Sequence, residues 1–169
     1  MAPTAEAKRV SRTKNDLPAE TRSQMVELCN QMLADCIDLE TQTKQAHWNV
    51  RGPHFYSLHL LFDKINEAVE EYVDLIAERA AQLGGRVRGT ARMVAESSRL
   101  PEYPADIRNG DEHVAALTES LSTFGRTARE AIDAADEAED KDTADVFTEI
   151  SRGIDQWLWF VESHQQAER

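Results

Sequence analysis

The sequence has few of the residues that stabilise small secreted domains or span membranes. Cysteine occurs only at Cys29 and Cys36 among 169 residues. On one helix these positions are about 10 Å apart, too far for a disulfide, so we expect two buried, neutral thiols. No apolar run approaches the ~18 residues of a transmembrane helix, and the polar N-terminus lacks the apolar segment of a secretory signal. We therefore expect a cytoplasmic protein.

Basic residues are also scarce. The chain has 19 lysines and arginines against 31 aspartates and glutamates, a formal net charge of −12. Such an acidic protein attracts cations, and its charge argues against a general nucleic-acid surface. The exception is segment 1–16, whose polar composition predicts a disordered tail ahead of a single domain at 17–169. Two acidic residues in this tail accompany four basic ones, a local charge of +2 that leaves −14 on the domain; the basic residues are Lys8, Arg9, Arg12 and Lys14.

Glycine and proline are few, and most lie between segments with helical periodicity. The connection at 86–109 is long enough to cross a bundle, whereas the other two connections are short turns. This order of connections predicts an all-α, ferritin-like four-helix bundle with one crossover. The expected helices are 19–49, 54–83, 111–138 and 143–165, with a short helix at 91–97 in the crossover.

The second predicted helix has potential metal ligands on the face opposite its apolar stripe. On a helical wheel they lie between about 100° and 200° from Leu58, whereas the apolar residues lie within about 60° of it. The ligands form two pairs with i, i+4 spacing, which lets both side chains of a pair reach one ion. These pairs are His59 with Asp63 and Asp74 with Glu78.

The two pairs cannot share an ion within one chain. His59 and Asp74 are about 22 Å apart along a helix, whereas ligands lie within about 2.5 Å of an iron or zinc ion. Two copies of the helix packed antiparallel about a twofold axis would join the first pair of one copy to the second pair of the other. His47 joins the first pair because a turn at 51–53 reverses the chain, which places His47 beside His59.

Two other interpretations remain open at this point. An acid-rich outward helix face is often only solvated, although His47 and His59 at compatible heights favour a metal site. Imidazole and carboxylate ligands suit iron, zinc or manganese, so a site that holds zinc without oxidising iron is also consistent with the sequence. The scarcity of thiolates argues against an iron–sulfur cluster or a structural zinc site.

The sequence KQAHWNVRG at 44–52, followed by the two ligand pairs and by the run 77–85, resembles the Dps family of miniature ferritins, the DNA-binding proteins from starved cells. The similarity extends from about Asn15 to the C-terminus and includes 103–107, 142–145 and 158–160. Departures are His54, where no family ligand is expected, and the unusually acidic body. All five family ferroxidase positions are matched, by His47, His59, Asp63, Asp74 and Glu78.

The resemblance implies a ferroxidase, an oxidoreductase that acts on metal ions. Twelve identical subunits would form a hollow shell with di-iron sites at its twofold interfaces. Fe(II) would be oxidised preferentially by hydrogen peroxide and stored as a ferric mineral, which protects DNA from oxidative damage. Zinc would compete for the same ligands. Trp48, next to a ligand, is a candidate sacrificial electron donor, with interface packing as the alternative.

Two further expectations follow from the resemblance. An acidic channel for iron is expected near the turn between the last two helices, with solvated side chains as the alternative; its candidates are Asp140, Asp142, Asp145 and Glu149. The alternative function is a nucleoid-compacting DNA-binding protein that uses the basic tail, with the metal sites secondary. That binding would be weak, independent of sequence and lost as salt rises, and the tail could equally be solvated without a partner.

Overall fold

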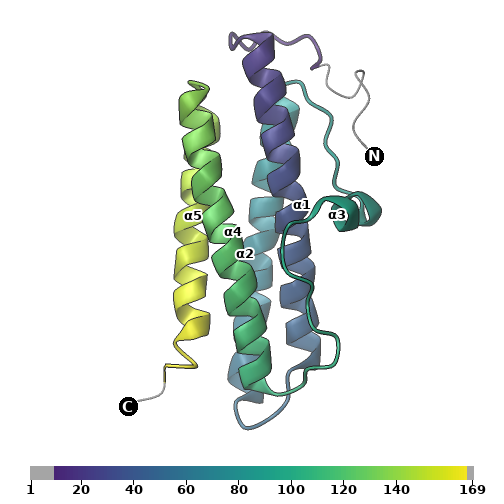
Figure 1. Ribbon diagram of the computed structural model, residues 1–169, viewed down its shortest axis with the longest axis vertical. Helices are drawn as coiled ribbons and strands as arrows, with labels where there is room; N and C mark the ends of the chain where they lie inside the picture. The colour runs from purple at the N-terminus through teal and green to yellow at the C-terminus, as the bar shows by residue number, and fades with distance from the viewer. Residues whose placement is uncertain (1–9, 167–169) are drawn as a thin grey trace.

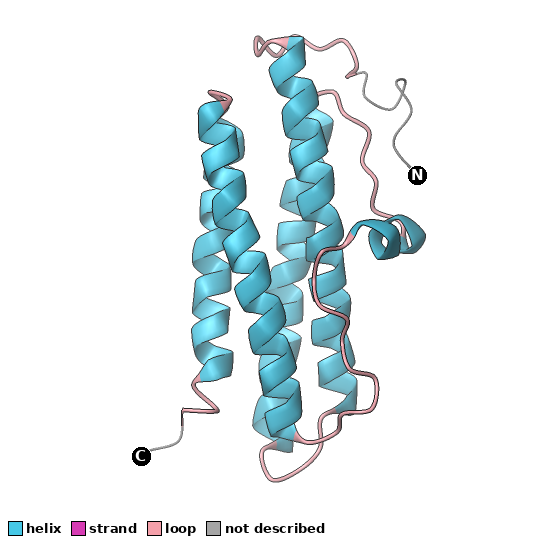
Figure 2. Ribbon diagram, viewed as in Figure 1, coloured by secondary structure: helices cyan, strands magenta, loops and turns pink. Residues whose placement is uncertain are grey.

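A computed structural model of the protein describes residues 10–166, which form two long helical hairpins packed side by side (Figures 1 and 2). In the first hairpin α1 packs against α2, and in the second α4 packs against α5. The crossover runs along α1 and carries α3 on the outside of the bundle (Figure 1). This arrangement confirms the predicted all-α bundle with one crossover. The helices are α1 Ala19–Asn49, α2 Phe55–Gln82, α3 Ala91–Ser97, α4 Gly110–Glu137 and α5 Lys141–Glu162.

The bounds of α1 and α3 match the prediction, and α2 is one residue shorter at each end than predicted. The starts of α4 and α5 are shifted by their caps. The Asn109 side chain accepts a hydrogen bond from the backbone N–H of Glu112, which starts α4 one residue earlier than expected. The Asp140 carboxylate accepts from the backbone N–H of Thr143 and starts α5 two residues earlier. The end of α5 at Glu162 falls three residues before the predicted end.

The core is built from the apolar stripe of each long helix. On α2 this stripe includes Leu58, Phe62 and Ile65, which are at most 2% exposed. Burial raises the pKa of the Cys29 thiol to about 12 and that of Cys36 well above its usual value, so both are neutral, unpaired thiols as expected. None of the helices formed by residues 10–166 is long and apolar enough to cross a membrane.

Residues 1–9 of the predicted disordered tail lie outside the described residues. Residues 10–16 of that tail are described, and Ser11 joins them to the end of α2. Ser11 donates its backbone N–H to the carbonyl of Gly84 (2.7 Å), and Arg22 Nη1 donates to the carbonyls of both Ser11 and Leu83. Gly84 has a φ of +82°, and a Cβ there would lie 2.8 Å from the Ser11 carbonyl oxygen. Glycine therefore permits both the helix end and the close approach of the N-terminal segment.

The turn between α1 and α2 is fixed by the end of the crossover. Arg51 donates its backbone N–H to the carbonyl of Arg108 (2.9 Å), and Val50 is fully buried. Beside this turn, the Tyr103 hydroxyl lies 2.6 Å from Nδ1 of His113, which is 1% exposed. Burial lowers the pKa of His113, so it is a neutral core residue.

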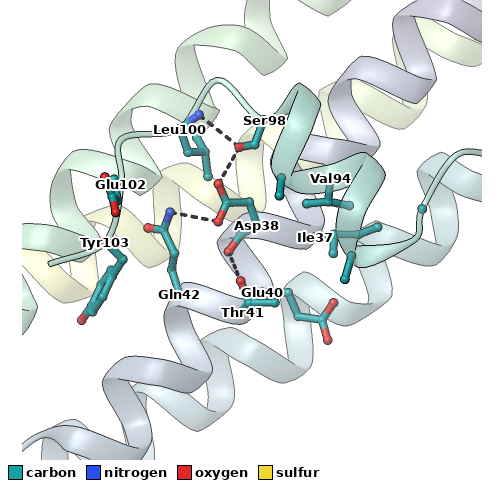
Figure 3. A pocket seen from close by; sticks show the side chains of 13 residues that line it. Ile37, Asp38, Glu40, Thr41, Gln42, Val94, Ser98, Leu100, Glu102 and Tyr103 are labelled. Atoms are coloured by element: carbon teal, nitrogen blue, oxygen red, sulfur yellow. Dashed lines mark hydrogen bonds between the residues drawn. The ribbon is translucent and has the colours of Figure 1, made fainter. Parts of the chain in front are cut away.

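The middle of the crossover is fixed on α1. Figure 3 shows Val94 of α3 next to Ile37 of α1, and Ser98 beside Asp38, at a cleft of about 790 Å³. The Ser98 hydroxyl donates to the Asp38 carboxylate, which also accepts from Gln42. The crossover is therefore a fixed layer over α1, held by both apolar and polar contacts.

A buried ion pair joins the end of α2 to the start of α5. Arg79 Nη2 lies 2.7 Å from the Asp140 carboxylate, and their side chains are only 6% and 1% exposed. Arg79 Nε also donates to the Thr143 hydroxyl, which in turn donates to Asp140. This network links the segment that carries Glu78 to the acidic turn between α4 and α5.

Replacing Asp140 with alanine should lower the free energy of unfolding by about 3–5 kcal/mol, because it leaves the Arg79 charge buried without its partner and removes the cap of α5. The matched control is Asp142→Ala, since Asp142 is 85% exposed and lies 3.8 Å from Arg79. The Asp142→Ala substitution should lower the free energy of unfolding by less than about 1 kcal/mol. Urea unfolding at one protein concentration measures both variants. Equal urea midpoints for the two variants would contradict the role of Asp140 as the buried partner of Arg79 and the cap of α5.

Candidate metal centre

His47 of α1 and His59 of α2 form a stacked pair at the closed end of the first hairpin. Their ring centroids are 3.8 Å apart and their planes differ by 19°. Nδ1 of each ring lies within 2.9 Å of the backbone carbonyl oxygen of the other histidine. A carbonyl oxygen can only accept, so each Nδ1 carries a proton and donates it. In the neutral rings both Nε2 atoms therefore keep a lone pair, the form in which imidazole binds metals.

Asp63 lies next to these histidines and is held by a lysine. Lys44 Nζ lies 2.6 Å from Oδ1 of Asp63, and His47 Nδ1 lies 3.7 Å from the same oxygen. The hydrogen bond from Lys44 is the largest cause of the lowered pKa of the Asp63 carboxyl group. Without a metal ion, the lysine therefore supplies the positive charge at this half-site.

Lys44 was not predicted from the sequence, although the residue spacing contained the signal. Lys44 is one helical turn before His47, and Asp63 is one turn after His59. A hairpin that pairs the two histidines must also pair these residues.

Asp74 and Glu78 are exposed near the other end of α2, as the wheel predicted. Within residues 10–166, no three side chains of His, Cys, Asp or Glu come together in a way that could hold a metal ion. The candidate ligands therefore lie in two separate groups, one towards each end of α2.

Three large apolar side chains that follow candidate ligands in the sequence are exposed. Trp48 follows His47 and is 61% exposed, Leu60 follows His59 and is 41% exposed, and Leu75 follows Asp74 and is 36% exposed. Exposed apolar groups gain free energy when a partner covers them. This surface, defined by Trp48, Leu60 and Leu75, is suited to contact with another protein surface.

Between the two half-sites, α1 and α2 form an acidic cleft of about 730 Å³, lined by Glu40, Glu67, Glu70, Glu71, Val73 and Asp74. Burial, followed by repulsion from Glu70, raises the pKa of the Glu40 carboxyl group. Negative charge is therefore concentrated along the outward face of α2.

The candidate channel residues fall into two groups. Asp142, Asp145 and Glu149 are exposed and lie on one face of α5, since they are three and four residues apart. Asp140 is 2% exposed and bound to Arg79 and Thr143. The prediction for Asp140 is wrong, because its carboxylate is a buried cap that is closed to a channel.

Among the DNA-binding candidates, Arg12 and Lys14 are exposed on the docked N-terminal segment. Lys8 and Arg9 lie outside the described residues.

Comparison with known proteins gives consistent results. Residues 26–169 match the ferritin-like domain family. The DNA protection during starvation protein of Agrobacterium fabrum is 44% identical over 155 residues, which cover 92% of this chain and 96% of the relative. The structure of DpsC from Streptomyces coelicolor has a TM-score of 0.91 at 31% identity and covers 96% of this chain and 95% of its own. Dps from Microbacterium arborescens in the high iron form has a TM-score of 0.84 at 28% identity, with coverage of 93% and 100%.

Replacing Lys44 with glutamine should raise the pKa of Asp63 and strengthen the binding of a divalent cation about 2- to 5-fold, the effect of removing one exposed ion pair that competes for the ligand. Calorimetric titration with Co²⁺, which avoids iron oxidation, measures the change. Lys64→Gln is the control, because it removes the same charge from the residue after Asp63. Equal affinities of the two variants would show that net charge alone, and not the pair with Asp63, affects binding.

Proposed function

Since this chain belongs to the Dps family of ferritin-like proteins, we propose that it is a ferroxidase that oxidises Fe(II), preferably with hydrogen peroxide. The ferric product would be stored in a hollow shell of twelve subunits, and removal of Fe(II) and peroxide together would protect DNA. The observation that carries this proposal is the arrangement along α2. His59 and Asp63 lie at one end, where His47 of α1 stacks on His59, and the exposed Asp74 and Glu78 lie towards the other.

The spacing of the ligands supports a site shared between two subunits. His59 and Glu78 are equally far from the midpoint between Ala68 and Val69, and so are Asp63 and Asp74. One antiparallel twofold pairing of α2 therefore brings both ligand pairs together at the same time, and creates two equivalent sites. The surface defined by Trp48, Leu60 and Leu75 would be covered in this pairing.

The relatives support iron as the substrate. One structural relative is a Dps described in a high iron form, and the Agrobacterium relative is a DNA protection protein. The mixed imidazole and carboxylate ligands suit Fe(II), and they also suit zinc, which we expect to act as a competitor.

Each ligand contributes a different property to the reaction. Asp74 and Glu78 are anionic oxygen ligands that stabilise the ferric state, and His47 and His59 contribute neutral nitrogens. Asp63 would bind a second ion, which would take the place of the Lys44 ammonium group beside its carboxylate. Two adjacent Fe(II) ions can give peroxide two electrons together, which with two protons yields water, so no hydroxyl radical is released.

Two neighbouring features would serve this chemistry. Asp142, Asp145 and Glu149 would attract Fe(II) from solution, because repeated negative charge around a symmetry axis raises the local cation concentration. Trp48 lies next to His47 and is 61% exposed in the single chain. It would donate an electron when the reaction leaves an unpaired electron at the site. In the assembly, the same indole would also pack against the partner.

The direct test is stopped-flow absorbance of ferric iron after anaerobic loading with Fe(II), with peroxide or air as the oxidant. Asp74→Ala should lower the peroxide-driven rate to nearly that of iron in buffer, because it removes an anionic ligand from every site. Glu119→Ala, an exposed carboxylate on α4, is the control and should react like the unmodified protein. A wild-type rate no faster than that of free iron would contradict the proposal.

Mixed shells test whether each site is shared. His59→Ala and Asp74→Ala damage opposite halves of a site, so each alone should be nearly inactive. In shells reassembled from equal amounts of both, half of the interfaces pair unlike subunits, and one of the two sites in each such interface is intact. About a quarter of the wild-type activity should return. Mixed shells that are no more active than either parent would mean that the ligands act within single subunits.

A second candidate function is binding of DNA, favoured by the exposure of Arg12 and Lys14 on the docked segment. Lys8 and Arg9 would add two further positive charges, and a shell would present many such segments at once. Deletion of residues 1–9 retains the docked part and should weaken binding in a gel-shift assay at low salt. The absence of any shift with the intact protein would remove this candidate and leave the iron function unaffected.

A further inference from the structure

The first part of the crossover is basic, in contrast to most of this acidic chain. Between residues 86 and 99 it contains four arginines and a single acidic residue, Glu96. Two of the arginines are used within the subunit, since Arg88 binds Glu27 and Arg99 binds Asp35. Arg86 and Arg92 are exposed, and within residues 10–166 neither has a carboxylate at ion-pair distance. Their charges are therefore available to a partner.

The N-terminal segment adds positive charge at the same place. The hydrogen bond from Ser11 to Gly84 puts Arg12 beside the start of the crossover, two residues before Arg86. Figure 1 shows the N-terminal segment and this part of the crossover on the same side of the bundle, next to α1. Arg12 and Lys14 are exposed there, and Asp16 is the acidic residue nearest to both along the chain. Residues more than seventy positions apart thus share one surface.

The backbone beneath this surface is held in place. Asn30, which is 3% exposed, donates to the carbonyl of Arg86 (3.1 Å) and accepts from the backbone N–H of Arg88 (2.8 Å). Farther along, Val94 is buried and Gln31 donates to the carbonyl of Ser97. The arginines are therefore presented from an ordered backbone, which lowers the entropy cost of binding.

From these contacts we propose that Arg12, Lys14, Arg86 and Arg92 form one surface that binds the phosphate backbone of nucleic acid. This inference rests on the second candidate function and assigns half of the contact to the crossover. Arg12 and Lys14 lie on the N-terminal segment, Arg86 on the start of the crossover and Arg92 on α3. Charges spread over these three segments fit an extended polyanion rather than a small anion. Guanidinium groups bind phosphates with two hydrogen bonds, and duplex DNA supplies one charge per ~1.7 Å of its axis. The acidic remainder of the chain restricts contact to this surface.

The test is fluorescence anisotropy of a labelled DNA duplex with intact shells at several salt concentrations. Arg86→Gln with Arg92→Gln should weaken binding at low salt at least ~10-fold, and should reduce the slope of log K against log salt by about 2, because two phosphate contacts are lost. Arg12→Gln with Lys14→Gln should have a similar effect. Arg126→Gln with Arg152→Gln removes the same charge from α4 and α5, and should change affinity less than ~3-fold.

Three results would overturn the inference. Wild-type affinity of the crossover variant, with a loss only in the N-terminal variant, would restrict binding to the tail. A crossover variant that elutes as a smaller assembly would make the surface a contact between subunits. No binding by the intact protein would remove both this surface and the second candidate function. Iron oxidation, measured on the same samples, should be unchanged in every variant, so failure of the DNA contact is distinguishable from failure of the ferroxidase.

Discussion

A helix rises about 1.5 Å per residue, and on α2 this rise keeps the two candidate ligand pairs too far apart to share an ion. The other features of the candidate site are consistent with that constraint. The ligands face away from the core of their own bundle, and each pair lacks a complete set of partners among the described residues. Trp48, Leu60 and Leu75 are exposed beside the ligands, where a second subunit would cover them. Metal chemistry and assembly would therefore depend on the same surface.

The first hairpin was predictable because short-range geometry determines it. Helical periodicity gives α1 and α2, and the turn between them sets which residues are opposite, so the contact between His47 and His59 follows from the sequence. The hydrogen bond from each Nδ1 to the backbone carbonyl of the other histidine does not follow from the sequence, because it depends on the side-chain rotamers. Lys44 was missed for a different reason. Lysine is not a usual metal ligand, and its ion pair with Asp63 is expected only when the site holds no metal ion.

Tertiary contacts explain the predictions that failed. Asp140 belongs to an acidic turn by composition, but a buried arginine 61 positions earlier makes it a structural cap. Residues 10–16 are polar enough to indicate disorder, yet Gly84 and Arg22 bind Ser11 of this segment at the end of α2. The same docking places the N-terminal positive charge beside the crossover. Acidic residues along α2 and α5 would therefore handle iron, while a separate basic surface would handle nucleic acid.

The central claim is that each iron site is completed by a second copy of the chain. Crystals of the assembly soaked anaerobically with Fe(II) would test it through anomalous scattering at the iron edge. The claim predicts two peaks at every twofold interface, each near Nε2 of His47 and His59 and the Asp63 carboxylate of one subunit, and near Asp74 and Glu78 of the other. Iron bound by ligands from one subunit alone, or twofold interfaces without iron, would contradict it.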